Sequence, residues 1–228
     1  MIIAKFAAVI IMGYLLGAIP FGVLIGRRMA KVDVRDRGSG KIGATNVLRT
    51  AGRKAAAIVV VLDILKGVLA VVFAGLIFGN SYLVVGNISL GTLVAQAAAA
   101  LAAIVGHNWS VFLRFHGGRG VATFFGGLLA LCPPAALFGG AIMIIGVGLT
   151  RYASLGSIAG MVGAYTILVP LTILNGSPIE YLGYALVGAI LIFVMHRDNI
   201  ARLMSGKERK LGEKAEERDL PSSIESMG

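Results

Sequence analysis

Long stretches without a charged side chain constrain this chain more than any other feature of its sequence. A helix needs about 20 mostly apolar residues to cross a bilayer core of about 30 Å, and several such runs occur here. The composition agrees, because 57% hydrophobic and 14% charged residues are too apolar for an ordinary soluble domain. We therefore predict an all-α, polytopic membrane helix bundle.

Single membrane helices are predicted, on length and lack of charge, for residues 2–26, 55–78, 87–106, 153–174 and 179–195. A further run, 121–150, exceeds one straight crossing, and Pro133-Pro134 breaks its middle, which favours two short helices. The expected total is about seven transmembrane helices, with about five or six as alternative counts. Close helix packing is expected at three glycine pairs, namely Gly13-xxx-Gly17, Gly22-xxx-Gly26 and Gly156-xxx-Gly160.

The loops between the predicted helices alternate between basic and uncharged. Apart from Lys5 and Lys66, Lys and Arg occur only in the segments 27–54, 107–120, 151 and 196–228, whereas the connections 79–86, 131–135 and 174–178 contain none. The positive-inside rule then places the basic loops and the C-terminus in the cytoplasm and the N-terminus outside. Residues 1–212 are expected to form one membrane-embedded domain. Residues 213–228 are expected to be a polar, disordered cytoplasmic tail.

The most basic loop also contains glycines and small polar side chains. It has nine basic residues against Asp33 and Asp36, and includes Gly38-Ser-Gly-Lys-Ile-Gly-Ala-Thr-Asn46 followed by Arg49. Glycines free the backbone to present N–H groups to an anion, and arginine adds a planar charged fork. The spacing is not that of a Walker A loop. Attraction to anionic lipid headgroups is the alternative, but the pattern favours a phosphate cradle.

Two further segments at predicted cytoplasmic boundaries contain candidate site residues. Gly117-Gly-Arg-Gly120 places an arginine just before a helix start, where free N–H groups and the helix dipole favour an anion. His107 lies at a helix end, where a structural and a functional role are equally open. His196-Arg-Asp-Asn199 follows the last apolar run directly, and a plain basic flank is its alternative interpretation.

These segments resemble the three signature motifs of the bacterial acyl-phosphate-dependent glycerol-3-phosphate acyltransferases, the PlsY family, in the order GSGKIGATNVLR, GHNWSVFLRFHGGRGVAT and HRDNIARL. The match extends between the motifs, as in Leu62-Asp-Ile-Leu-Lys-Gly67, and covers the chain from about residue 10 to 212. Two positions depart from the family pattern. Lys41 stands where the family has asparagine, and Arg119 stands where it has lysine.

The resemblance implies transfer of an acyl group from acyl phosphate to the 1-hydroxyl of glycerol 3-phosphate, giving lysophosphatidic acid and phosphate at the cytoplasmic face of a bacterial plasma (inner) membrane. The implied catalytic residues are Ser39, Arg49, Arg119, His196 and Asn199. Phosphate binding is implied for Gly40, Lys41, Thr45, Asn46, His107, Gly117, Gly118 and Gly120. The expected partners are the two substrates and membrane lipid, without nucleic acid, cofactor or metal.

The chemistry suits these residues, because acyl phosphate is already activated and the enzyme chiefly needs positioning and charge stabilisation. His196 is the best protein candidate for general base or substrate orienter. The substrate's own phosphate could also accept the proton, and the sequence does not separate the two. A hydrophobic groove for the acyl chain is implied by the product.

Other functions are less well supported by the residues. A phosphate or organophosphate transporter would need polar groups at the bilayer midplane and ideally an internal repeat, and only Asp63 and Lys66 meet the first condition. These two residues are at i and i+3 in a predicted membrane helix, and their opposite charges are expected to neutralise each other. A metal-dependent headgroup transferase would need clustered aspartates, which the chain lacks.

Overall fold

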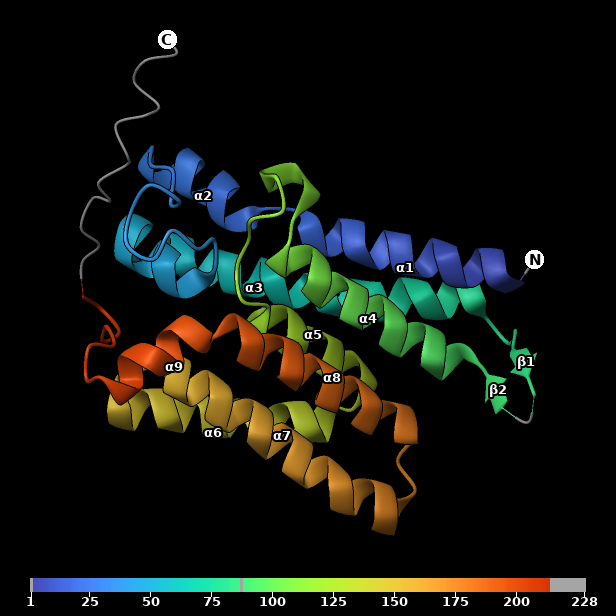
Figure 1. The fold of residues 1–228 in the computed structure, drawn as a ribbon. Coiled ribbons are helices and arrows are strands. Elements are labelled where there is room, and N and C mark those ends of the chain that lie inside the picture. The colour runs from blue at the N-terminus through green and yellow to red at the C-terminus, as the bar shows by residue number, and fades with distance from the viewer. Residues whose placement is uncertain (1, 87, 214–228) are drawn as a thin grey trace.

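Apolar helices dominate the computed structural model, which describes residues 2–86 and 88–213 (Figure 1). Most of the predicted tail, 214–228, lies outside the described residues. In chain order the helices are α1 (Ile2–Ala18), α2 (Phe21–Ala30), α3 (Ala44–Phe78), α4 (Thr92–Asn108), α5 (Val121–Leu131), α6 (Pro133–Thr150), α7 (Ala153–Asn175), α8 (Ile179–Met195) and α9 (Arg197–Met204), with a 3-10 turn, η1 (Val111–Leu113), before α5. The predicted helical membrane fold is confirmed.

The number of membrane-spanning segments is lower than the expected seven. Within the described residues, five helical segments are long and apolar enough to cross a membrane, or six if α8 and α9, bent by 61°, count as one. One span fewer results from 121–150, and at a count of five the other is α8, which qualifies only together with α9. The chain breaks before Pro133 as predicted, but α6 has 18 residues and α5 has 11. Eleven residues span about 16 Å, half of a bilayer core.

Helix boundaries also differ from the predicted ones near the first basic loop. The predicted helix 2–26 is two helices, because the ring of Pro20 interrupts the hydrogen-bond ladder between α1 and α2. The next helix, α3, begins at Ala44 instead of residue 55, so the second half of the basic loop is helical. Gly52, at φ 86°, leaves helical geometry and separates this first part of α3 from the rest.

A short antiparallel pair, β1 (Leu83–Val85) and β2 (Ile88–Leu90), connects α3 to α4 where the sequence predicted the start of a helix at 87. This hairpin is the one departure from an all-α fold in the part of the chain that the structure describes. It is remote from the basic loops, at the end of the bundle that also holds the N-terminus (Figure 1).

The two ends of the bundle differ in charge. Figure 1 shows the loop after α2, the turn between α6 and α7, and α9 at one end, and the hairpin and the α7–α8 connection at the other. The basic segments of the sequence therefore gather at one end, opposite the uncharged connections. Which end faces the cytoplasm stays a prediction.

Glycines allow the helices to approach closely, as predicted for Gly13-xxx-Gly17 and Gly156-xxx-Gly160, whereas Gly22 and Gly26 lie against the loop after α2. A Cβ at Gly13 or Gly17 of α1 would lie 2.3 or 2.0 Å from a carbonyl oxygen of α4. Gly67 is equally tight, because its Cβ would lie 2.2 Å from the carbonyl oxygen of Thr123. This contact places the start of α5 midway along α3. The loop before α5 therefore reaches into the bundle.

Candidate functional site

A cavity of about 450 Å³ at the basic end brings together residues of all three predicted motifs. The predicted site residues that line it are Ser39, Lys41, Thr45, Asn46, Arg49, His107, Arg119, Gly120 and His196. A neighbouring cavity of about 20 Å³ is lined by Asn199 and shares Ser39, Thr45, Arg49 and Arg119 with the larger one. The volume of the larger cavity, about 450 Å³, is within the range of small-molecule sites.

Three helices begin at the larger cavity. Its lining includes Gly43 and Ala44 at the start of α3, Gly120 and Val121 at the start of α5, and Ala153 and Ser154 at the start of α7. The N–H groups of a first helical turn lack partners within the helix, and the helix dipole adds partial positive charge there. The basic end of the cavity is therefore suited to anions even before its arginines are counted.

The two predicted arginines come from different elements, Arg49 from the first part of α3 and Arg119 from the loop before α5. A terminal nitrogen of Arg49 donates to the carbonyls of Arg209 and Lys210, each at 3.1 Å. The Nε atoms of Arg49 and Arg119 have no hydrogen-bond partner among the described residues. Burial lowers the pKa of Arg119 to about 10, against the opposing effect of the Glu208 carboxylate. Arg119 therefore stays charged near neutral pH and is available to an anion.

The amide of Asn46 holds the first motif in shape. Its Nδ2 donates to the carbonyls of Val34, Lys41 and Arg37 at 2.7, 2.9 and 3.2 Å, and its Oδ1 accepts from the N–H of Ser39 at 3.0 Å. Because these four bonds use the whole amide, the structure does not favour the predicted contact of Asn46 with phosphate. Its position instead fixes the backbone of Ser39 at the cavity wall.

Three predicted glycines line neither cavity. Gly40 takes a φ of 67° and donates its N–H to the carbonyl of Arg37, so it shapes the loop. A Cβ at Gly117 would lie 2.2 Å from the carbonyl oxygen of His107, and one at Gly118 would lie 2.1 Å from Nε2 of the same histidine. These two glycines let the loop before α5 lie against the end of α4. Their predicted contact with phosphate is therefore not favoured by the structure.

His107 belongs to a buried polar cluster with Asp63 and Lys66. The Lys66 ammonium lies 2.8 Å from Asp63 Oδ1, which confirms the predicted neutralisation, and His107 Nδ1 lies 3.6 Å from the same oxygen. All three side chains are less than 5% exposed. Because His107 also contacts Gly118, the cluster connects α3 to the loop that holds Arg119. We interpret His107 as a residue that supports this loop.

His196 follows the last residue of α8 and faces the larger cavity. Its Nδ1 lies 2.8 Å from the carbonyl oxygen of Ile192, so Nδ1 carries the proton and Nε2 is left as an acceptor. Burial, with the nearby charge of Arg119, lowers the pKa of His196 to about 4. The imidazole is therefore neutral near pH 7.

Sequence reasoning missed two polar residues of the site. Ser154, in the first turn of α7, is 3% exposed and lines both cavities. Glu208 follows α9 and lines the smaller cavity, where its carboxylate accepts from Ser154, Asn199 and Arg202. A serine after a short turn and a glutamate in a polar tail have no distinctive local pattern. Only their contacts across the fold reveal them.

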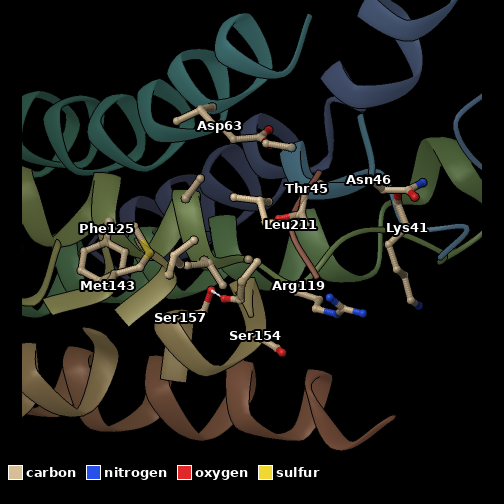
Figure 2. A pocket seen from close by; sticks show the side chains of 18 of the residues that line it. Lys41, Thr45, Asn46, Asp63, Arg119, Phe125, Met143, Ser154, Ser157 and Leu211 are labelled. Carbon is tan, nitrogen blue, oxygen red and sulfur yellow. Dashed lines mark hydrogen bonds between the residues drawn. The ribbon is translucent and has the colours of Figure 1, made fainter. Parts of the chain in front are cut away.

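The larger cavity changes from polar to apolar along its length. Figure 2 shows Lys41 and Arg119 at one end and Phe125 and Met143 at the other. The apolar walls come from α3, α5 and α6, and comprise Val60, Ile64, Val121, Ala122, Phe125, Met143, Ile144, Val147 and Gly148. Val60 and Ile144 are 37% and 69% exposed, so the groove opens on the outer surface between α3 and α6. These residues are the groove walls that the sequence could not name.

Comparisons with known proteins agree with the geometry. The family model described as glycerol-3-phosphate acyltransferase matches residues 7–206. The chain is 60% identical to glycerol-3-phosphate acyltransferase 3 of Dehalococcoides mccartyi, over 94% of this chain and all of the relative. It is 45% identical to the glycerol-3-phosphate acyltransferase of Thermus thermophilus, over 92% of this chain and 96% of the relative.

Two solved structures resemble the fold. The crystal structure of PlsY, an integral membrane glycerol 3-phosphate acyltransferase, in its glycerol 3-phosphate form has a TM-score of 0.78 and 36% sequence identity. The comparison covers 91% of this chain and 96% of that one. The lysophosphatidic acid form of PlsY gives a TM-score of 0.76 at the same identity, over 91% of this chain and 95% of that one.

Proposed function

The chain belongs to the glycerol-3-phosphate acyltransferase family, and from this premise we propose that it transfers an acyl group from acyl phosphate to the 1-hydroxyl of glycerol 3-phosphate. The products are lysophosphatidic acid and inorganic phosphate. One observation supports the proposal most strongly: a single cavity joins a cationic end, where three helices begin, to an apolar groove open to the membrane. Acyl phosphate has the same two-part chemistry, with an anionic head and a long apolar tail.

The residues at the polar end have roles that follow from their charge. Arg49 and Arg119 bind the phosphates of donor and acceptor, and Arg119 stabilises the negative charge that develops on the carbonyl oxygen and the leaving phosphate. Ser39, Lys41 and Thr45 add donors from the first motif and the start of α3. The glycerol oxygen forms a bond to the acyl carbon, and the bond from that carbon to the phosphate oxygen breaks.

The proton of the glycerol hydroxyl ends on phosphate. A pKa of about 4 makes His196 a weak proton acceptor near pH 7, and the phosphate that leaves in the reaction gains a free oxygen that can hold the proton. A base whose pKa is closer to the working pH takes a proton more efficiently. His196 Nε2 therefore orients the hydroxyl by accepting its hydrogen bond, and a substrate phosphate oxygen removes the proton.

The donor is tested with the purified protein in detergent, glycerol 3-phosphate and three separate acyl sources, namely acyl phosphate, acyl-CoA and acyl carrier protein. Lysophosphatidic acid and an equal amount of phosphate should form with acyl phosphate alone, with or without a metal chelator. Formation of lysophosphatidic acid from acyl-CoA or acyl carrier protein without acyl phosphate would overturn the proposed donor. Loss of activity in the chelator would show that a metal takes part.

We also propose that the active site faces the cytoplasm of a bacterial plasma membrane, because the basic segments gather at the end that holds it. Single cysteines at Asn175 and Ser205, introduced after Cys132→Ala, should react with an impermeant thiol reagent from opposite sides of the membrane. Asn175 should be labelled in intact cells and Ser205 only in inverted vesicles. Labelling of both from one side would overturn this orientation.

Filling the apolar groove should reduce activity with long acyl chains selectively. Gly148 lines the groove, and a Cβ there would meet no atom within 4 Å, so Gly148→Phe places a ring in open space. Displacing two methylenes, each worth about 0.8 kcal/mol, should lower kcat/KM for a long-chain acyl phosphate about tenfold. Activity with acetyl phosphate, which needs no groove, should stay unchanged.

Gly140→Phe is the matched control, because Gly140 lies on the same helix, has equally open space and does not line the cavity. It should leave kcat/KM for both donors within about twofold of wild type, as for an ordinary surface substitution. Equal losses in the two variants would place the acyl chain elsewhere.

A further inference from the structure

The residues after α9 turn back toward the polar end of the larger cavity. The N–H of Leu211 donates to the carbonyl of Arg151, between α6 and α7, at 2.7 Å, and the Arg151 side chain donates to the carbonyl of Leu211 at 3.4 Å. Arg49 of α3 donates to two other carbonyls of the same segment, each at 3.1 Å. The segment 209–212 is therefore attached both to α3 and to the turn between α6 and α7.

One side chain of this segment faces the cavity. Lys210 and Gly212 are exposed, whereas Leu211 between them is half-buried and lines the larger cavity. Figure 2 shows Leu211 between the polar end of the cavity, at Arg119, and the apolar end, at Phe125. An apolar side chain from an otherwise polar segment thus lies where the two parts of the cavity meet.

The reactive group of an acyl phosphate belongs at this junction. With its anionic head at the cationic end and its tail in the apolar groove, the carbonyl carbon that joins them lies beside Leu211. Water can attack that carbon as an alcohol does. Its oxygen forms a bond to the acyl carbon, the bond to the phosphate oxygen breaks, and fatty acid and phosphate form, with the protons of water passing to the products. A closed site prevents such a side reaction.

We propose that Leu211 is a specificity-determining residue, which closes the cavity beside the acyl carbon so that the glycerol hydroxyl reacts and water does not. The inference rests on the proposed function, because it takes acyl phosphate as the bound donor. The leucine side chain offers no hydrogen bond to water and fills space that a water molecule, of about 30 Å³, would need. The attachments to Arg49 and Arg151 hold it there.

Leu211→Ala tests the inference, because it removes most of the side chain and leaves the backbone attachments of the segment in place. Purified protein receives acyl phosphate and glycerol 3-phosphate, and lysophosphatidic acid and free fatty acid are both measured, after subtraction of the hydrolysis that occurs without protein. The ratio of fatty acid to lysophosphatidic acid should rise about tenfold, the order of discrimination that a methylene group provides in a pocket. Leu211→Met keeps the volume, and its ratio should stay within about twofold of wild type.

Met204→Ala is the matched control, since Met204 is 86% exposed on α9 and lines neither cavity. Its product ratio should stay within about twofold of wild type. A parallel loss of both products in Leu211→Ala would mean that Leu211 only supports the fold. An unchanged ratio would mean that water is excluded by other residues. Either result would overturn the inference.

Water enriched in the heavy oxygen isotope identifies the atom that water attacks. The label should appear in the fatty acid released by Leu211→Ala, and label in the phosphate instead would place the attack at phosphorus and contradict the inference. The same assay separates the two proposals. Wild type that forms no lysophosphatidic acid from acyl phosphate would refute the proposed function, whereas normal formation by wild type with an unchanged ratio in Leu211→Ala would refute the role of Leu211 alone.

Discussion

Arg119→Gln should lower turnover by about a hundredfold, the order expected when a group that stabilises developing charge is removed. Arg119 lines both cavities at the start of α5, its Nε has no partner among the described residues, and it stays charged near neutral pH. Glutamine keeps part of the side-chain length and an NH2 group but loses the charge and the guanidinium fork. Steady-state kinetics with acyl phosphate and glycerol 3-phosphate measure the effect.

Arg119→Lys distinguishes electrostatic stabilisation from proton donation. If the residue supplies only positive charge, the lysine variant should keep most of its activity. Its activity should fall at a lower pH than that of wild type, because lysine has the lower ordinary pKa and burial lowers both. A lysine variant faster than wild type would indicate that an acid assists the leaving phosphate.

Arg114→Gln is the control for this series, since Arg114 is exposed in the same loop and lines neither cavity. It should leave turnover within about twofold of wild type. Full activity in Arg119→Gln would remove Arg119 from the site, and equal losses in both variants would mean that bulk positive charge explains activity.

Lys66→Met should destabilise the fold by about 3–5 kcal/mol, because it leaves the Asp63 carboxylate buried without its cation. The ammonium lies 2.8 Å from Asp63 and 4.9 Å from the centre of the Phe21 ring, so it also connects α3 to α2. Methionine fills a similar volume, which makes the lost charge the main change. Unfolding in mixed detergent micelles with increasing SDS measures the loss.

Removing both charges provides the control. Asp63→Asn combined with Lys66→Met leaves no buried ion, and it should recover most of the stability lost in the single variant. A single variant as stable as wild type would show that the pair contributes little to the fold. A double variant that is stable but inactive would give the pair a role in catalysis, contrary to the neutralisation inferred from its geometry.

The helices were predicted from patterns of residues within short segments of the sequence. Lack of charge over about 20 residues marks a membrane helix because burying a charge in lipid is costly. The break at Pro133 is equally local, because proline cannot continue a helix. The length of α5 was not predictable in this way. The loop before it is drawn into the bundle through contacts with α3 and α4, which are distant in sequence.

The candidate site was likewise predictable only in part from the sequence. Glycines, hydroxyl groups and arginines in three basic segments indicated an anion site, because these residue types commonly bind phosphate in proteins. Their individual roles stay predictions that the variants above test. The sequence did not reveal that the Asn46 amide is used by its own loop, that Ser154 and Glu208 join the site, or which residues form the apolar groove.

The sequence by itself therefore determined the helical membrane fold and indicated an anion site, because hydropathy and charge are properties of each segment. Only the tertiary structure decided which side chains line the two cavities. A hydrogen bond such as that between Asn199 and Glu208 depends on how the chain turns after α9, and the groove depends on how α3, α5 and α6 pack. Both result from contacts between segments, which no single segment specifies.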